Sequence, residues 1–208
     1  VIFPAFLPSP KADDFIEKTN EFLLALAGEV GRGMLVLFTS RGHLQRSFHE
    51  LHDPLQRCGV TLLAQGVEGS RRHILQRFQD EVHSVLFGTD SFWEGVDVPG
   101  ESLEIVVIVR LPFAVPTEPI VQAQMEEIEK SGKNPFMEFS VPEAAIKLRQ
   151  GAGRLIRRRD DRGVVIILDN RVITTRYGST FKRSLPGKTI RADSLSMLIQ
   201  NVKQWFER

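Results

Sequence analysis

Cysteine is nearly absent from this sequence, which has only Cys58 in 208 residues. A single thiol can form neither a disulfide within the chain nor a thiolate metal site by itself, so we expect a reducing compartment. Long hydrophobic runs are absent as well, because the longest runs, such as 105–109, are far shorter than the ~20 residues that cross a bilayer. A secretory signal pattern is also missing. We therefore expect a soluble, cytoplasmic protein with no membrane partner.

The composition is that of an ordinary globular domain, since 42% of the residues are hydrophobic and 25% are charged. These values exclude disordered, collagen-like and coiled-coil proteins. The length predicts one domain over residues 1–208. The chain begins with Val1 instead of methionine, so we expect it to be cut from a longer polypeptide.

Positive and negative side chains nearly balance, with 27 Lys and Arg against 26 Asp and Glu, which excludes a uniformly basic protein that coats nucleic acid. The balance differs locally, because acidic side chains dominate 115–142 and basic ones dominate 143–163. Polyanions are expected to bind the second segment. All 5 histidines lie within 43–83 without metal-binding spacing, so no metal site is predicted.

Short runs rich in Val, Ile and Leu recur along the chain and do not alternate with polar residues. Such runs predict strands that are buried on both faces. They occupy 34–38, 61–64, 85–87, 103–109 and 164–168. Helical patterns separate them, which predicts an α/β fold with a parallel sheet between helix layers. The chemistry of such sheets collects in loops beyond the carboxyl ends of the strands.

Two helices are predicted from their caps. Asp14 and Glu17 form a capping-box pattern before an apolar stripe, and Asp193 is expected to cap a helix that runs to Phe206. A cluster of prolines in 112–142 surrounds the helical segment 120–130. This segment interrupts the alternation and predicts an insertion on the sheet.

The strongest polar signal is the octapeptide QGAGRLIR at 150–157. On one continuous helix, Gln150, Arg154 and Arg157 would point the same way. Two glycines inside a helix cost about 1 kcal/mol each, which predicts that a backbone or a ligand approaches closely. Guanidinium groups beside glycines suit a phosphate chain, and the alternative is a solvated arginine-rich helix.

A second polar segment, 88–100, follows a predicted strand and is dense in hydroxyls, carboxylates and glycines. Thr89 can donate to a nucleic-acid phosphate, while Glu94 and Asp97 can accept from a ribose or an arginine. Both carboxylates are equally explained as turn or capping groups. Trp93 is better explained by packing beneath the loop.

A third segment, Thr39-Ser40-Arg41, ends the first predicted strand and opens a helix. Hydroxyls at a helix amino end can cradle phosphate, although such a residue is commonly just an N-cap. The tripeptide Gly187-Lys188-Thr189 imitates the end of a P-loop, but Lys182 stands where the P-loop requires glycine. We interpret that tripeptide as a turn before a short strand.

Taken in chain order, these segments resemble the motifs of the second motor domain of superfamily-two helicases, and in particular DinG-type DNA helicases related to XPD. Residues 35–40 resemble the fourth motif, 88–100 the fifth and 150–163 the sixth. The resemblance covers nearly the whole chain. Three linking phrases are also similar to that subfamily: Leu111-Pro112-Phe113, Lys133-Asn134-Pro135-Phe136 and Arg176-Tyr177-Gly178.

The resemblance implies a RecA-like domain without a P-loop that works with an N-terminal RecA-like domain of the same polypeptide. ATP and Mg²⁺ would be held mainly by that first domain. Arg154 and Arg157 would act as arginine fingers that stabilise charge on the γ-phosphoryl group. Gln150 would sense the γ-phosphate, and further nucleotide contacts would come from Glu94, Gly95 and Asp97.

The resemblance also implies that single-stranded DNA phosphates bind Thr39, Ser40 and Thr89, with Arg41 as a further candidate, and that the motor moves in the 5' to 3' direction. An iron–sulfur cluster needs four cysteines, so it could lie only in the absent first domain. Two alternatives stay open. One is a non-catalytic α/β module that binds nucleic acid through 143–163. The other is an enzyme of a different α/β family that uses 88–100, against which the missing triad and metal spacing count.

Overall fold

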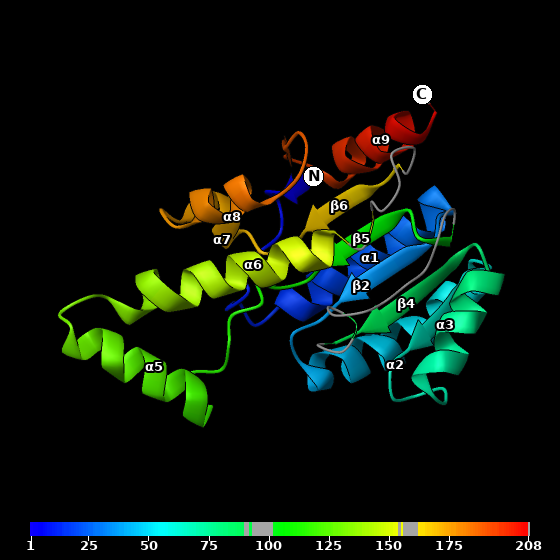
Figure 1. Ribbon diagram of the computed structural model, residues 1–208. Helices are drawn as coiled ribbons and strands as arrows, with labels where there is room; N and C mark the ends of the chain where they lie inside the picture. The colour runs from blue at the N-terminus through cyan, green and yellow to red at the C-terminus, as the bar shows by residue number, and fades with distance from the viewer. Residues whose placement is uncertain (90–91, 93–101, 154, 156–161, 208) are drawn as a thin grey trace.

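The computed structural model describes residues 1–89, 92, 102–153, 155 and 162–207. Within this part of the chain, parallel strands form a 7-stranded sheet in the order β3-β4-β2-β5-β6-β1-β7 (Figure 1). The strands are β1 (Ile2–Pro4), β2 (Met34–Leu37), β3 (Thr61–Ala64), β4 (Ser84–Gly88), β5 (Ile105–Ile108), β6 (Val164–Ile167) and β7 (Ile190–Ala192). The predicted α/β fold with a parallel sheet is confirmed.

Burial on both faces explains why the strand sequences do not alternate with polar residues. In β2, Met34 and Val36 pack into the apolar cluster on one face of the sheet, and Leu35 and Leu37 pack into the cluster on the other. All four side chains are 0% exposed. Since both rows of a strand must then be apolar, an unbroken Val, Ile and Leu run is the pattern that the fold requires.

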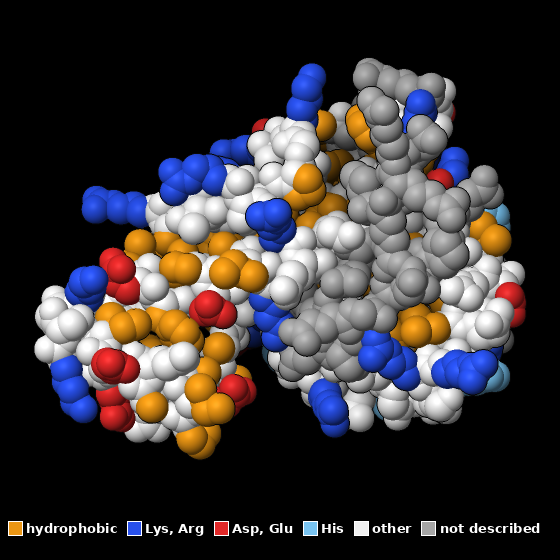
Figure 2. All heavy atoms as spheres, in the orientation of Figure 1, with side chains coloured by type: hydrophobic (Ala, Val, Ile, Leu, Met, Phe, Trp, Pro, Cys, Tyr) orange, Lys and Arg blue, Asp and Glu red, His pale blue; other side chains and the backbone are white. Residues whose placement is uncertain are grey.

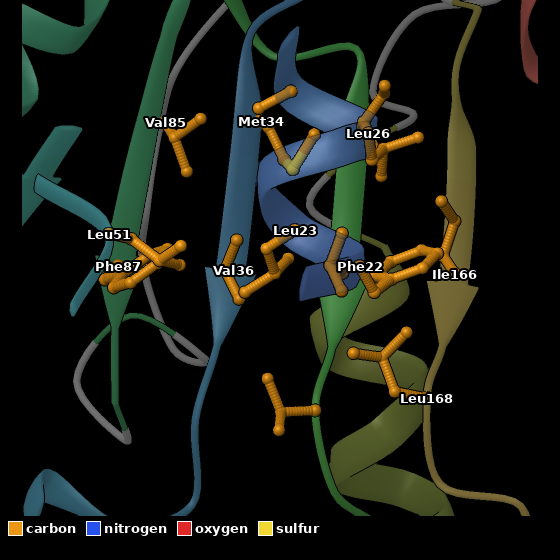
Figure 3. Packing of buried hydrophobic residues seen from close by; sticks show 14 of the residues in the cluster. Phe22, Leu23, Leu26, Met34, Val36, Leu51, Val85, Phe87, Ile166 and Leu168 are labelled. Carbon is orange, nitrogen blue, oxygen red and sulfur yellow. The ribbon is translucent and has the colours of Figure 1, made fainter. Parts of the chain in front are cut away.

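Three helices cover the first face, namely α1 (Phe15–Val30), α2 (Arg41–Arg57) and α9 (Leu195–Phe206). Figure 3 shows Phe22, Leu23 and Leu26 of α1 lying against strand side chains such as Val36 and Ile166. The stripe predicted for this helix is therefore confirmed as its buried face.

The second face is covered by α3 (Arg71–Asp80), α6 (Val141–Ala152), α7 (Arg171–Thr174) and α8 (Gly178–Ser184). Phe78 of α3, Leu148 of α6 and Phe181 of α8 are each fully buried in the cluster on this side. The sheet is thus sandwiched between two helix layers, and apolar side chains cover both faces of its strands from β2 to β6.

The predicted Asp193 cap is wrong, and Asp14 takes the predicted N-cap position without the expected capping bond. Asp14 occupies the N-cap position of α1 but has φ −86° and ψ 0° and makes no side-chain capping bond. The cap of α9 is Ser194, whose Oγ accepts from the Met197 N–H, while Asp193 pairs with Arg191. A capping side chain needs an extended backbone, which Ser194 has at φ −148° and ψ 159° and Asp14 lacks.

The proline-rich segment contains α5 (Pro119–Lys130) and a short π-helix, η2 (Phe136–Ser140). The predicted helical segment is therefore confirmed, but α5 buries none of its side chains and, with the start of α6, projects away from the sheet (Figure 1). Figure 2 shows hydrophobic side chains spread over this projection. The exposed large ones there include Ile120, Phe136, Met137 and Ile146. The bounds 112–142 of the insertion stay a prediction.

The two short strands β1 and β7 complete the sheet beside β6. Strand β1 is not recognisable in the sequence, because three residues that end in proline are too short for a periodic signal. The predicted turn before a short strand is confirmed, since Gly187 has φ +79° and β7 follows it. Within the described residues, no helix is both long enough and apolar enough to cross a membrane.

Close packing at Gly178 generates a prediction about stability. A Cβ added there would lie 2.1 Å from the carbonyl oxygen of Val172, whereas a Cβ at Gly28, exposed within α1, would meet only Cys58 Sγ at 3.9 Å. We expect Gly178→Ala to lower the free energy of unfolding by about 1–3 kcal/mol. The control Gly28→Ala should raise it by up to about 1 kcal/mol. Urea unfolding measures both, and equal midpoints would contradict the tight contact.

Candidate nucleic-acid and nucleotide site

The carboxyl ends of the strands meet at one edge of the sheet because all strands run in the same direction. Thr39 and Ser40 follow β2, Gln65 follows β3 and Thr89 follows β4. These three strands are neighbours in the sheet. Polar residues that are far apart in the sequence are thereby brought to the same edge.

Ser40 is the N-cap of α2. Its backbone is extended, at φ −140° and ψ 127°, and its Oγ accepts a hydrogen bond of 3.4 Å from the His43 N–H. The simple N-cap explanation of Ser40 is therefore correct. Because the oxygen acts as the acceptor in that bond, the hydroxyl hydrogen can still be donated to another group. Thr39 and Arg41 on either side of Ser40 are exposed.

Thr89 is only 6% exposed and directs both of its donors at one atom. Its backbone N–H donates to Gln65 Oε1 at 2.8 Å, and its hydroxyl donates to the same oxygen at 2.9 Å. Sequence reasoning missed Gln65. The signal that could have found it is its position, directly after the predicted strand 61–64.

A pocket of about 180 Å³ opens between the ends of β2, β3 and β4. It brings Arg41 together with Thr89, two of the four residues predicted to contact DNA, but not Thr39 or Ser40. Among the described residues that line it, one is positively charged, Arg41, and none is acidic. The lining residues are Arg41, Leu44, Gln45, Gln65, Gly66 and Thr89.

The helix that carries Gln150 is shorter than predicted. It ends at Ala152 with Gly153 as its C-cap, and Leu155 lies outside any helix, so the expected continuous helix through Arg157 is wrong. Leu155 is buried and packs against Gly163, where an added Cβ would lie within 2.6 Å of its side chain. Leu155 is thus held against the core outside the helix.

The helix end also changes the interpretation of the two glycines. Gly151 lies in the last turn of α6 on its buried side, and Gly153 is the C-cap. Gly153 is therefore explained by the helix end, whereas Gly151 lies inside the helix, and the expected close approach there stays a prediction. Gln150 is exposed in the same turn. Arg154 and Arg157, and the predicted nucleotide contacts Glu94, Gly95 and Asp97, lie outside the described residues.

A buried ion pair holds the segment after β5 against the segment after β6. Asp169 is 1% exposed. Its Oδ2 accepts one hydrogen bond of 2.8 Å from the Leu111 N–H and another of 2.6 Å from Arg171 Nη2. Burial acts to lower the pKa of Arg171, but the hydrogen bond and charge of Asp169 raise it overall. The Arg171 guanidinium also lies 5.2 Å from the Phe113 ring centroid. The Phe113 ring also lies 6.1 Å from the Tyr177 ring, centroid to centroid, so two of the phrases similar to the subfamily are in contact.

Arg110, which follows β5, adds positive charge to the same edge. Its Nη2 donates to the carbonyl oxygen of Pro10 at 2.8 Å, and its guanidinium lies 5.0 Å from the Phe15 ring centroid. Burial lowers the pKa of Arg110. The pKa of His43 is also lowered, first by burial and then by the charges of Arg110 and Arg46. His43 is therefore neutral at pH 7, and this part of the edge owes its charge to arginine.

Within the described residues, no group of three or more His, Cys, Asp or Glu side chains is arranged to hold a metal ion.

A parallel sheet between two helix layers, with hydroxyl-bearing segments where its central strands end, defines a RecA-like α/β domain. The chain belongs to the helicase C-terminal domain family, whose sequence model matches residues 23–188. The predicted resemblance to DinG-type helicases related to XPD is confirmed.

Relatives and a solved structure support this assignment. The 3'-5' exonuclease DinG of Bacillus subtilis (strain 168) is 43% identical over 178 residues, which cover 85% of this chain and 19% of that protein. The ATP-dependent DNA helicase YoaA of Haemophilus influenzae is 40% identical over 197 residues, or 95% of this chain and 30% of that protein. The chain thus spans less than a third of either relative.

A solved structure of an XPD helicase superposes with a TM-score of 0.66 at 18% identity, over 92% of this chain and 35% of that one. At this low identity, the superposition demonstrates a shared fold.

The lowered pKa of His43 predicts a specific loss of stability in acid. A histidine whose folded pKa lies below its unfolded value of about 6.5 takes up its proton more readily when unfolded. Stability should therefore fall as the pH drops below about 6.5, and His43→Gln should reduce that fall. Urea unfolding across this pH range measures it, with the exposed His49→Gln on the same helix as the control. Parallel pH profiles for parent and His43→Gln would contradict the expectation.

Proposed function

We propose that this chain is the second motor domain of an ATP-dependent DNA helicase that translocates 5' to 3' on single-stranded DNA. One observation carries the proposal: in a member of the helicase C-terminal domain family, the residues that resemble motifs four and five converge on the same edge of the sheet. Arg41 and Thr89 line one pocket there. The names of the relatives, DNA helicases among them, support DNA as the ligand.

The nucleotide part of the proposal rests on the sixth and fifth motifs. ATP, bound between this domain and an N-terminal RecA-like domain, supplies the phosphoanhydride bond whose hydrolysis drives the motor. Arg154 and Arg157 donate to the γ-phosphate and stabilise the charge that develops there. Gln150 is exposed at the end of α6, so its amide is accessible to a phosphate. Further nucleotide contacts come from Glu94, Gly95 and Asp97, and the first domain holds Mg²⁺.

The DNA part of the proposal uses neutral donors more than charge. Thr39, Ser40 and Thr89 donate hydroxyl or backbone hydrogens to phosphodiester oxygens, and Arg41 adds one exposed guanidinium. Such contacts fix the strand without reading its sequence. Few cations mean a shallow salt dependence, which suits a motor that must release each phosphate as it moves.

The first test uses the 208-residue chain alone. If the nucleotide is held mainly by a first motor domain, this chain should show negligible ATP hydrolysis with or without single-stranded DNA. A coupled phosphate-release assay measures the rate. Robust turnover by the isolated chain would show that it does not depend on a partner domain.

The second test uses the full-length protein. We expect Arg157→Ala to lower the DNA-stimulated kcat for ATP hydrolysis by roughly 10³–10⁵, the range for loss of an arginine finger, with an unchanged melting temperature. Arg158→Ala and Arg159→Ala remove charges from the same basic segment and are the matched controls, which should retain most of the activity. An unchanged kcat for Arg157→Ala would show that Arg157 does not act as an arginine finger.

The same variants test the non-catalytic alternative, in which the basic segment 143–163 binds nucleic acid by charge alone. That alternative predicts equal losses of DNA affinity for Arg154, Arg157, Arg158 and Arg159 and no effect on hydrolysis. Fluorescence anisotropy with a labelled single strand separates the two functions.

A further inference from the structure

The hydrogen bonds of Thr89 conflict with its proposed contact with DNA. Thr89 offers two donors, its backbone N–H and its hydroxyl, and both are directed at Gln65 Oε1 at 2.8 and 2.9 Å. The N–H can only donate, so the side-chain atom that faces it has to be the amide oxygen of Gln65. In this state neither donor of Thr89 is available to another acceptor.

A phosphodiester group carries no hydrogen at neutral pH and can only accept. It cannot bond to Thr89 through the hydroxyl hydrogen or the N–H while Gln65 holds both. Gln65 and a DNA phosphate are therefore alternative partners of the same two donors. Hydrogen bonds to an ionised acceptor are roughly twice as strong as neutral ones, so an arriving phosphate can displace the amide.

We propose that Gln65 is a competitor of the DNA phosphate: it occupies the donors of Thr89 when the site is empty, yields them when a phosphate enters, and recaptures them as the phosphate leaves. This inference rests on the proposed function, because it takes Thr89 to be a DNA contact. Gln65 is thus a positioning residue that sets how readily the strand is released.

Burial explains why such a competitor is useful. Thr89 is 6% exposed, so a departing phosphate would leave two poorly hydrated donors without a partner. Unsatisfied buried donors are costly, and that cost would oppose release. Gln65 satisfies both donors in the empty state and removes the penalty. The strand can then dissociate from Thr89 without a large barrier, as a translocating motor requires.

The local structure places Gln65 for this role. The Gln65 N–H donates to the Phe87 carbonyl at 2.9 Å, which continues the pairing of β3 with β4. The chain then turns, with the Val67 N–H bonded to the Ala64 carbonyl at 3.2 Å and Gly66 at φ +78°, a conformation that favours glycine. The backbone of Gln65 is thus held on both sides, and its side chain alone has to move.

The pocket of about 180 Å³ provides the space for the exchange. Gln65 and Thr89 both line it, and Arg41 lines it from the start of α2. A phosphate that enters there meets the donors of Thr89 and a guanidinium in the same pocket. The anion can bond to Thr89 only after the Gln65 amide has released the two donors, because Gln65 Oε1 accepts both of their hydrogens.

The experiment measures affinity and dissociation rate of a fluorescently labelled oligothymidylate with the full-length protein. Gln65→Ala removes the competitor and should tighten binding roughly three- to tenfold, mainly through slower dissociation. Gln65→Glu strengthens the competitor and repels phosphate, so it should weaken binding. Thr89→Val should weaken binding and cancel the gain when combined with Gln65→Ala.

The control is Gln76→Ala, which removes an exposed glutamine that donates to Asp80 on α3 and should leave the affinity unchanged. Circular dichroism checks that each variant is folded. If Gln65→Ala weakens DNA binding as Thr89→Val does, then Gln65 only holds Thr89 in the orientation that binds DNA. The proposal that Gln65 competes with the phosphate would then be wrong.

The outcomes separate this inference from the proposed function. If Thr89→Val weakens DNA binding but Gln65→Ala does not tighten it, Thr89 remains a DNA contact and only the competition fails. If Thr89→Val has no effect on DNA affinity, the assignment of Thr89 fails and the competition fails with it.

Discussion

The single direction of the strands is the constraint on which the rest of this structure depends. Strands that all run the same way need a crossover after each one, and the crossovers cover both faces of the sheet with helices. Both faces are then apolar and closed, so the polar chemistry is left to the loops. All carboxyl ends also share one edge, which is why Gln65 and Thr89, each after a different strand, line the same pocket.

The positions of the parallel strands could be predicted accurately from the sequence. Helix caps and helix ends, which depend on local backbone angles and packing, could not. The apolar runs located five of the seven strands because two-sided burial leaves an unbroken signal in the sequence. The caps at Asp14 and Asp193 failed because capping depends on backbone angles that the neighbouring packing decides. The helix through Arg157 failed because Leu155 turns into the core against Gly163, a contact that helical periodicity does not contain.

The residues of the candidate site were also predictable only in part. Segments that carry motif residues were recognisable because hydroxyls and glycines stand directly after predicted strands. Gln65 escaped notice because its importance comes from a bond to Thr89, 24 positions away, which follows the next strand of the sheet. A single sequence contains both residues but not their pairing. The bond from the Leu111 N–H to Asp169, which joins residues 58 positions apart, was hidden in the same way.

The placement of β1 has a consequence for biosynthesis. Ile2 is aligned with Ile166 of β6 on one side and with Ile190 of β7 on the other, so β1 pairs only with strands that come much later in the sequence. Until the ribosome has released those residues, the first strand has no template and its apolar side chains stay uncovered. Strands β2 to β5 pair with one another and can assemble before β6 and β7 are synthesised, so β1 is expected to join the sheet late.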